Sequence, residues 1–213
     1  MKQSALRVAI FVIANYAVMA RAGGLESLEN FLKATRSGRA EFTQQVSAPA
    51  RQGQAARTRN SSGRFEFVRP ERFRFSYRKP FEQTLVADGR TLWLHDPDLN
   101  QVTARPQAQA LGATPAALIA TASDLRALQA DFVLTEEPAQ DGQQWVLATP
   151  RQADGAVQRV RIGFRGAELS TLEILDSFGQ RSLLSFSQFQ ANPALDPGLF
   201  QFRPPPGADL IRP

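Results

Sequence analysis

Apolar side chains follow two different spacings along the chain, and the spacing changes near residue 37. Before this point they lie three or four residues apart, which predicts one amphipathic helix over roughly residues 24–36, with Gly38 as its stop signal. Beyond it, apolar and polar residues alternate, which indicates strands with one apolar face each. The helical set is Leu25, Leu28, Phe31 and Leu32, and the alternating sets are Phe42 and Val46; Phe65 and Phe67; Phe73, Phe75 and Tyr77; Val160, Ile162 and Phe164. The pattern therefore predicts a mainly β domain that begins with one helix.

Glycine-containing turn signals separate the strands at short intervals. They are Asp88-Gly89, Asp141-Gly142, Asp154-Gly155, Arg165-Gly166 and Phe178-Gly179. This spacing is expected of antiparallel neighbours joined by hairpins, so we predict a meander, curled or closed. After it we expect a turn or short helix near Asp196 to Leu199, a strand through Phe200 and Phe202, and a proline-rich tail. No internal repeat suggests a second domain.

Helix signals interrupt the strand pattern between Arg105 and Asp131. Thr114 can cap a helix that starts at Pro115 and continues through AALIA. Ser123 can cap a second helix through DLRALQ. We therefore expect two short helices inserted in the middle of the sheet, where they could close a concavity as a detachable cover.

The N-terminus has the three parts of a secretory signal peptide. Lys2 and Arg7 form a basic region, an apolar run covers residues 8–19, and ARA at 20–22 is a small-x-small cleavage site. The run is shorter than the roughly 20 residues of a spanning helix, so a membrane anchor is the weaker interpretation. We expect residues 1–22 to be a signal peptide cleaved after Ala22, and residues 23–213 to form a single domain.

Charge and cysteine content narrow the possible functions. The formal net charge is +5, but without Lys2, Arg7 and Arg21 there are 22 basic and 20 acidic residues, a balance of about +2 that favours no particular partner. The chain has no cysteine, which excludes disulfides, thiol catalysis and thiolate metal sites.

Candidate catalytic groups are few. The single histidine, His95, lies in LHDPD, where a strand-end role is favoured over a base or a ligand. Asp96 and Asp98 flank Pro97, which is typical of a turn, and calcium binding would need more carboxylates at regular spacing. The sequence has no nucleophile elbow, phosphate-binding loop, dinucleotide fingerprint or zinc-helix motif. We expect no enzyme, no cofactor and no metal, and a hydrolase would have to use His95 or the aspartate pair.

The stretch VRPERFRFSYRKP, residues 68–80, is both basic and aromatic. Such a ribbon can bind nucleic acid, but a stacking platform needs arginines and aromatics on the same face. Alternate residues of a strand face opposite sides, so here the two kinds separate. The aromatic face holds Phe73, Phe75 and Tyr77, and the basic face holds Arg72, Arg74 and Arg78. We expect no nucleic-acid partner; the aromatic face is one wall of a packed core or of a hollow container, which periodicity alone does not distinguish.

Arg69 falls on the apolar side of this stretch. Counting back by twos from Phe73 places it with Phe65 and Phe67, and a buried arginine needs hydrogen-bond acceptors. Backbone carbonyls of the inserted helices could supply them. The residues alone favour the simpler alternative, a salt bridge at the rim with Glu71 or another exposed acid.

Five segments together resemble the LolA family of periplasmic lipoprotein carriers. They are EFTQQV at 41–46, RFEFVRPERFRF at 64–75, LVADGRTLWLHDP at 85–97, TPAALIA at 114–120 and DFVLTEEP at 131–138. The resemblance implies an incomplete antiparallel barrel of about eleven strands, with an N-terminal helix and short lid helices over a hydrophobic cavity. It implies a monomeric carrier that takes lipoproteins from an inner-membrane ABC releasing complex to an outer-membrane receptor of the LolB type. The alternative is a periplasmic binding protein for another lipid or hydrophobic ligand.

The resemblance also assigns roles to residues. The arginine of the family's R-P pair hydrogen-bonds lid backbone, so Arg69 would be the lid latch, with partners around Leu118 and Ile119. Ala116 and Ala117 stand where many relatives have larger apolar residues, which implies a lid with less apolar area. The expected cavity lining is Phe42, Val46, Phe65, Phe67, Phe73, Phe75, Tyr77, Leu85, Ala117, Leu118 and Ile119.

Overall fold

A computed structural model of the protein describes residues 23–49, 57–110, 122–152 and 155–213. Its helices are α1 (Gly24–Ala34), α2 (Gln107–Ala110), α4 (Leu125–Asp131) and the 3-10 helix η2 (Pro197–Phe200). Its strands are β1 (Ser37–Ser47), β2 (Thr58–Val68), β3 (Arg72–Lys79), β4 (Gln83–Asp88), β5 (Thr91–Asp96), β6 (Gln101–Pro106), β7 (Phe132–Gln140), β8 (Gln143–Pro150), β9 (Val157–Arg165), β10 (Glu168–Asp176), β11 (Arg181–Ala191) and β12 (Asp209–Ile211).

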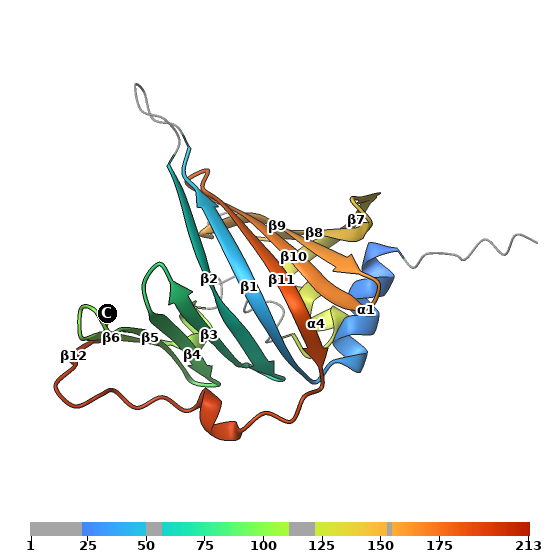
Figure 1. Ribbon diagram of the computed structural model, residues 1–213. Coiled ribbons are helices and arrows are strands. Elements are labelled where there is room, and N and C mark those ends of the chain that lie inside the picture. Colours follow the sequence, from blue (N-terminus) through green and yellow to red (C-terminus); the bar gives the residue numbers. More distant parts are fainter. Residues whose placement is uncertain (1–22, 50–56, 111–121, 153–154) are drawn as a thin grey trace, which may run out of the picture.

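The strands form one sheet in the order β12-β6-β5-β4-β3-β2-β1-β11-β10-β9-β8-β7. Neighbours are antiparallel except β12 and β6, which are parallel. Strand β1 therefore lies near the middle of the sheet beside β11, and β7 and β12 end it. Figure 1 shows a strongly curved sheet with α1 and α4 together on one side. The predicted open, mainly antiparallel sheet is confirmed, with 12 strands in place of about eleven.

Hairpins occur at the predicted turn signals that the structure describes. The glycines at positions 89, 142, 166 and 179 all have positive φ, the backbone region that favours glycine in tight turns. The signal at Asp154-Gly155 begins outside the described residues.

Helix α1 confirms the predicted N-terminal helix and ends at Ala34, two residues early. Its buried face holds Leu28, Phe31 and Leu32, which pack on the concave side of the sheet. Gly24 lies so close to the carbonyl oxygen of Trp145 in β8 that a side-chain carbon there would overlap it. The approach of α1 to the sheet therefore depends on a glycine at its first turn.

The helical insertion differs in detail from the prediction. Helix α4 is capped by Asp124, whose Oδ1 accepts from the backbone N–H of Ala127 (2.9 Å), so the expectation of Ser123 as the cap is wrong. Ser123 Oγ instead donates to the carboxylate of Asp124 (3.5 Å). The helix expected to start at Pro115, capped by Thr114, lies outside the described residues.

The C-terminal segment passes along the outer face of the sheet (Figure 1). Helix η2 confirms the turn or short helix expected near Asp196 to Leu199. The strand expected through Phe200 and Phe202 is wrong, because Phe200 ends η2 and the pairing strand is β12. The ring of Phe202 instead lies against Trp93 and His95, with centroids 5.5 and 5.6 Å apart. His95 therefore has a packing role at the end of β5.

Candidate functional site

The inner face of β1, β2 and β3 carries a continuous cluster of phenylalanine rings, here called the aromatic wall. Its members are Phe42, Phe65, Phe67, Phe73 and Phe75, each exposed by 2% or less. The strand register places Phe65 opposite Phe75 and Phe67 opposite Phe73. The rings of Phe65 and Phe75 are stacked with centroids 4.4 Å apart, and Phe42 meets Phe75 edge-on at 5.3 Å. Cross-strand pairs of this kind stabilise the sheet and give it an apolar inner surface.

The helices cover one end of the aromatic wall. Phe31 of α1 lies 6.4 Å from Phe67 and 5.6 Å from Phe164 of β9, measured between ring centroids. Leu128 of α4 and Ala122 just before it belong to the same buried cluster. In this structure the wall is therefore closed over by α1 and α4 at the end near Phe67.

Tyr77 and Val46 lie at the end of the wall away from Phe67, and Leu85 is opposite Phe75. Tyr77 is part-buried, its ring meets Phe42 at 5.1 Å, and its hydroxyl donates to Gln44 Oε1 (3.0 Å). Burial raises the pKa of Tyr77 to about 12, so its hydroxyl stays neutral in ordinary buffers. Val46 and Leu85 are only half-buried. The three expected lid residues Ala117, Leu118 and Ile119 lie outside the described residues.

Arg69 joins the two helical segments to the sheet from a buried position. It is 7% exposed and follows β2 directly. Its Nε donates to the carbonyl of Thr35 (2.9 Å), which caps the C-terminus of α1, and its Nη1 donates to the carbonyl of Ala122 (2.7 Å), at the entry to α4. One side chain therefore fixes the end of one helix and the start of another.

Two aromatic rings complete the surroundings of Arg69. Its guanidinium carbon lies 5.5 Å from the ring centre of Phe31 and 5.2 Å from that of Phe67. Burial, with the positive charge of Arg36 nearby, lowers the pKa of Arg69 to about 10, which still leaves it charged near neutrality. Among the described residues Nη2 has no hydrogen-bond partner. The charge is thus held by two carbonyls and two rings.

The salt bridge that the residues alone favoured for Arg69 is wrong. Within the described ranges Arg69 has no carboxylate partner, and Glu71 is exposed with positive φ in the turn before β3. Arg69 does bind backbone carbonyls, but that of Ala122 lies three residues before α4 and not within an inserted helix. The partners expected around Leu118 and Ile119 lie outside the described residues. The contact with Thr35 was not anticipated, because a helix C-terminus more than thirty residues away leaves no signal in the local pattern.

The outer face of β3 is basic, as the alternation predicts. Arg78 pairs with Glu41, which also binds Arg64 (2.9 Å), and Arg74 donates to Ser76 Oγ (3.0 Å). Arg72 and Arg74 are half-buried, whereas Arg78 is exposed. The arginines and the aromatic wall therefore lie on opposite sides of the sheet.

Among the described residues no group of three or more His, Cys, Asp or Glu comes together to hold a metal ion. No helix in the described ranges is long and apolar enough to cross a membrane.

Comparison with known proteins gives the family. The model of the family described as outer membrane lipoprotein carrier protein LolA matches residues 33–203. This chain belongs to the LolA family. A relative from Albidiferax ferrireducens, named outer-membrane lipoprotein carrier protein, is 64% identical over 208 residues, 96% of this chain and 98% of the relative. One from Methylibium petroleiphilum with the same name is 52% identical over 192 residues, 90% and 91% of the two chains.

Two solved structures share the LolA-family fold. A LolA superfamily protein from Nitrosomonas europaea matches with a TM-score of 0.50 at 13% identity, covering 85% of this chain and 99% of the other. An uncharacterized conserved protein from Thermus thermophilus matches with a TM-score of 0.53 at 14% identity, covering 89% and 98%. At these identities the likeness concerns the fold alone.

Proposed function

We propose that the protein is a periplasmic carrier that binds the acyl chains of lipoproteins released from the inner membrane and delivers them to an outer-membrane receptor. Its family and the carrier names of its relatives support this function. The observation that carries it is the joining of an apolar wall to a helical cover through one buried arginine. A carrier of this kind performs no catalytic step and needs no cofactor.

Acyl chains match the aromatic wall chemically, and their size limits how they can be held. Burying a CH₂ group is worth about 0.8 kcal/mol, so some 45 methylenes of a triacylated lipoprotein would contribute on the order of 36 kcal/mol. Non-covalent affinities reach only about 20 kcal/mol, and a carrier must release its cargo. Part of the acyl surface therefore stays unburied, or part of the binding free energy opens the helical cover.

Arg69 is the proposed latch of that cover. Hydrogen bonds from a charged donor contribute about 1.5–3 kcal/mol each, which is small beside the binding of acyl chains but large enough to set the open population. When cargo enters against the wall, α4 moves away and Arg69 loses its bond to Ala122. The return of that bond favours closure and release. The proposed cavity lining comprises the aromatic wall with Val46, Tyr77 and Leu85, and the lid residues Ala117, Leu118 and Ile119.

Membership of the LolA family supports the route proposed here. Residues 1–22 direct export and are removed after Ala22, and residues 23–213 act as one domain in the periplasm. The monomeric carrier receives lipoproteins from an inner-membrane ABC releasing complex and passes them to an outer-membrane receptor of the LolB type.

Arg69→Leu tests the latch. We expect the variant to fold and to accept lipoprotein, but to pass at least about tenfold less to the receptor in the same time, because closure is weakened. Loading is measured by co-purification of lipoprotein and release by transfer to membranes that carry the receptor. Arg90→Leu, which removes an exposed arginine from the turn after β4, is the matched control.

Two outcomes would contradict the proposal. Normal handover by Arg69→Leu would remove the latch role while leaving the carrier function intact. Mass spectrometry of molecules that co-purify from periplasm tests the carrier function itself: a free lipid or other hydrophobic ligand in place of lipoproteins would favour a different binding protein on the same scaffold.

A further inference from the structure

Phe178 is an aromatic side chain held out into solvent at a turn tip. It is 82% exposed, in the turn between β10 and β11. The carboxylate of Asp176 accepts the backbone N–H groups of Phe178 (2.9 Å) and Gln180 (2.8 Å), and Gly179 has a φ of 78°. Since these bonds fix the turn, the exposed position of Phe178 is a property of the backbone and not of a loose loop.

Two exposed arginines lie next to this turn on the outer face. Leu175 of β10 is paired with Arg159 of β9 on one side and with Arg181 of β11 on the other. Strands are spaced about 4.8 Å apart, so the two arginines are about 10 Å apart with Leu175 between them. Neither forms an ion pair within the part of the chain that the structure describes.

Arg161, two residues further along β9, differs from these two arginines because it is ion-paired. Arg161 pairs with Glu137 and Glu173, both at 2.6 Å, and lies over the ring of Trp145. These two carboxylates raise the pKa of Arg161 against the effect of burial. Arg159 and Arg181 form no ion pair of this kind with a described carboxylate, and the one carboxylate in their groove, that of Glu173, already binds Arg161.

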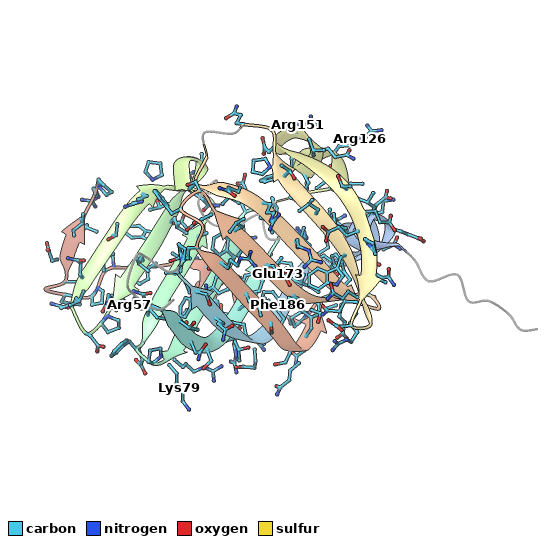
Figure 2. All side chains as sticks on the ribbon, turned by 90° about the horizontal axis from the view of Figure 1, so that it is seen from above. Arg57, Lys79, Arg126, Arg151, Glu173 and Phe186 are labelled. Atoms are coloured by element: carbon cyan, nitrogen blue, oxygen red, sulfur yellow. The ribbon has the colours of Figure 1, made fainter. Side chains whose placement is uncertain are left out.

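A groove on the outer face contains both arginines. It has a volume of about 260 Å³, and its lining combines arginines and apolar side chains with one carboxylate, that of Glu173. The lining residues are Gln45, Ser47, Arg159, Arg161, Glu173, Ile174, Leu175, Arg181, Ser182 and Leu183. Arg57 and Lys79, both labelled in Figure 2, are also exposed. Arg57 adjoins Thr58, which is level with Ser47 and so with Arg181.

We propose that the Phe178 turn and its arginines dock the protein onto an anionic phospholipid surface. A protruding aromatic ring enters the boundary between headgroups and acyl chains, while nearby arginines bind headgroup phosphates. A stable protein–protein interface buries about 800 Å² on each partner, which is more than one exposed ring beside a narrow groove offers. This inference goes beyond the carrier function, because it concerns the empty protein and a membrane without any receptor.

The position of the docking surface leaves the latch free. Arg181 is level with Ser47 at the end of β1, whereas Arg69 follows Val68, which is level with Ser37 at its start. Ten residues of β1, at about 3.3 Å each, separate the level of Arg181 from the level of Arg69 by about 33 Å. Docking through Phe178 therefore leaves Arg69 and the ends of the helices away from the lipid.

Co-sedimentation of the purified, cargo-free protein with vesicles tests the docking surface. We expect binding to vesicles of phosphatidylethanolamine and phosphatidylglycerol (about three to one) and little binding to phosphatidylcholine alone, with the preference lost at high salt. Phe178→Ser should weaken binding about tenfold, and Arg159→Glu with Arg181→Glu at least about 20-fold.

Matched controls use features of the same kind elsewhere. The control for Phe178→Ser is Leu99→Ser, which removes another apolar turn residue that is 68% exposed but lies beside the negative charges of Asp96 and Asp98. The control for the arginine pair is Arg105→Glu with Arg165→Glu, which makes the same change in charge at other exposed sites. We expect both controls to bind as the unchanged protein does, and all variants to load lipoprotein normally.

Three results would overturn the inference. The first is no binding to anionic vesicles, or equal binding to both compositions. The second is full binding by the Phe178 or arginine variants, and slower transfer to receptor-containing membranes in that case would make the surface a protein-docking site. The third is release by inorganic phosphate beyond the effect of sodium chloride at equal ionic strength, which would assign the groove to a free anion.

Discussion

The contacts of Arg69 predict how strongly the helical cover is held closed. Arg69 links the end of α1, through Thr35, to the entry of α4, through Ala122. Arg69→Leu removes the donors and the charge but keeps an apolar side chain beside Phe31 and Phe67. We expect α4 to detach from the sheet more often, while the sheet itself keeps its stability.

The magnitude follows from opposing contributions. Two charge-assisted hydrogen bonds contribute about 3–6 kcal/mol together, and the two rings about 1–2 kcal/mol. The fall in the pKa of Arg69 from 12.5 to about 10 corresponds to roughly 3 kcal/mol against holding the charge in this site. The balance is on the order of 1–5 kcal/mol, and a middle value of about 3 kcal/mol is roughly a 100-fold change in the open population.

Native-state hydrogen exchange measures this population. In Arg69→Leu the amide of Leu128 in α4 should exchange roughly 100-fold faster, while the amides of Phe42 and Phe186 in the β1–β11 pair keep their rates. Arg90→Leu should change neither region. Unaltered exchange of the α4 amides would refute the reasoning, because Arg69 would then not stabilise the closed position of α4. Equal acceleration of the sheet amides would also refute it, because Arg69 would then stabilise the whole fold and not the cover alone.

Three further outcomes test other contacts. Asp124→Ala should lower the stability of α4 by about 1 kcal/mol, measured by exchange of its amides, because the helix loses its cap. Tyr77, the single tyrosine after residue 22, should titrate near pH 12 in the folded protein and near pH 10 in denaturant by ultraviolet absorbance; since the folded pKa is the higher, its contribution to stability is present below pH 10 and is lost as the pH rises through 12. Gly24→Ala should lower the unfolding free energy by about 2 kcal/mol or more in urea, because the new carbon overlaps the Trp145 carbonyl. Gly155→Ala, where the nearest atoms of the described residues beyond its chain neighbours are 4.0 Å away, should have little effect.

The inner face of the sheet was predictable from single-residue alternation. Phe65, Phe67, Phe73 and Phe75 point inward because a strand places every second residue on one side, and the hairpin between β2 and β3 keeps the two sets in phase. The same count placed Arg69 on the inner side. These results depend only on local geometry, which the sequence states directly.

The partners of Arg69 were less accessible, since they depend on how distant elements meet. Thr35 caps the C-terminus of α1, and its carbonyl is available because the end of a helix leaves acceptors unpaired. No local pattern in the sequence indicates which donor reaches this carbonyl. Asp124 and Ser123 are adjacent, and both residue types are favoured as N-caps, so the choice depends on the residue at which α4 begins, which is Leu125. Phe202 alternates like a strand residue, yet it packs on Trp93 because the C-terminal segment crosses the outer face without pairing there.

The pairing of β1 with β11 has a kinetic consequence. Gly38 lies opposite Ala191, so the middle of the sheet joins a strand from the beginning of the chain to one from near its end. Closing such a long loop is slow, and sheets rich in distant contacts fold more slowly than those built from neighbours. A chain that emerges from its N-terminus cannot complete the sheet until residues 181–191 have appeared. Until then the aromatic wall lacks the neighbouring strand β11. Fast completion of the chain, or binding by chaperones, would limit aggregation during this period.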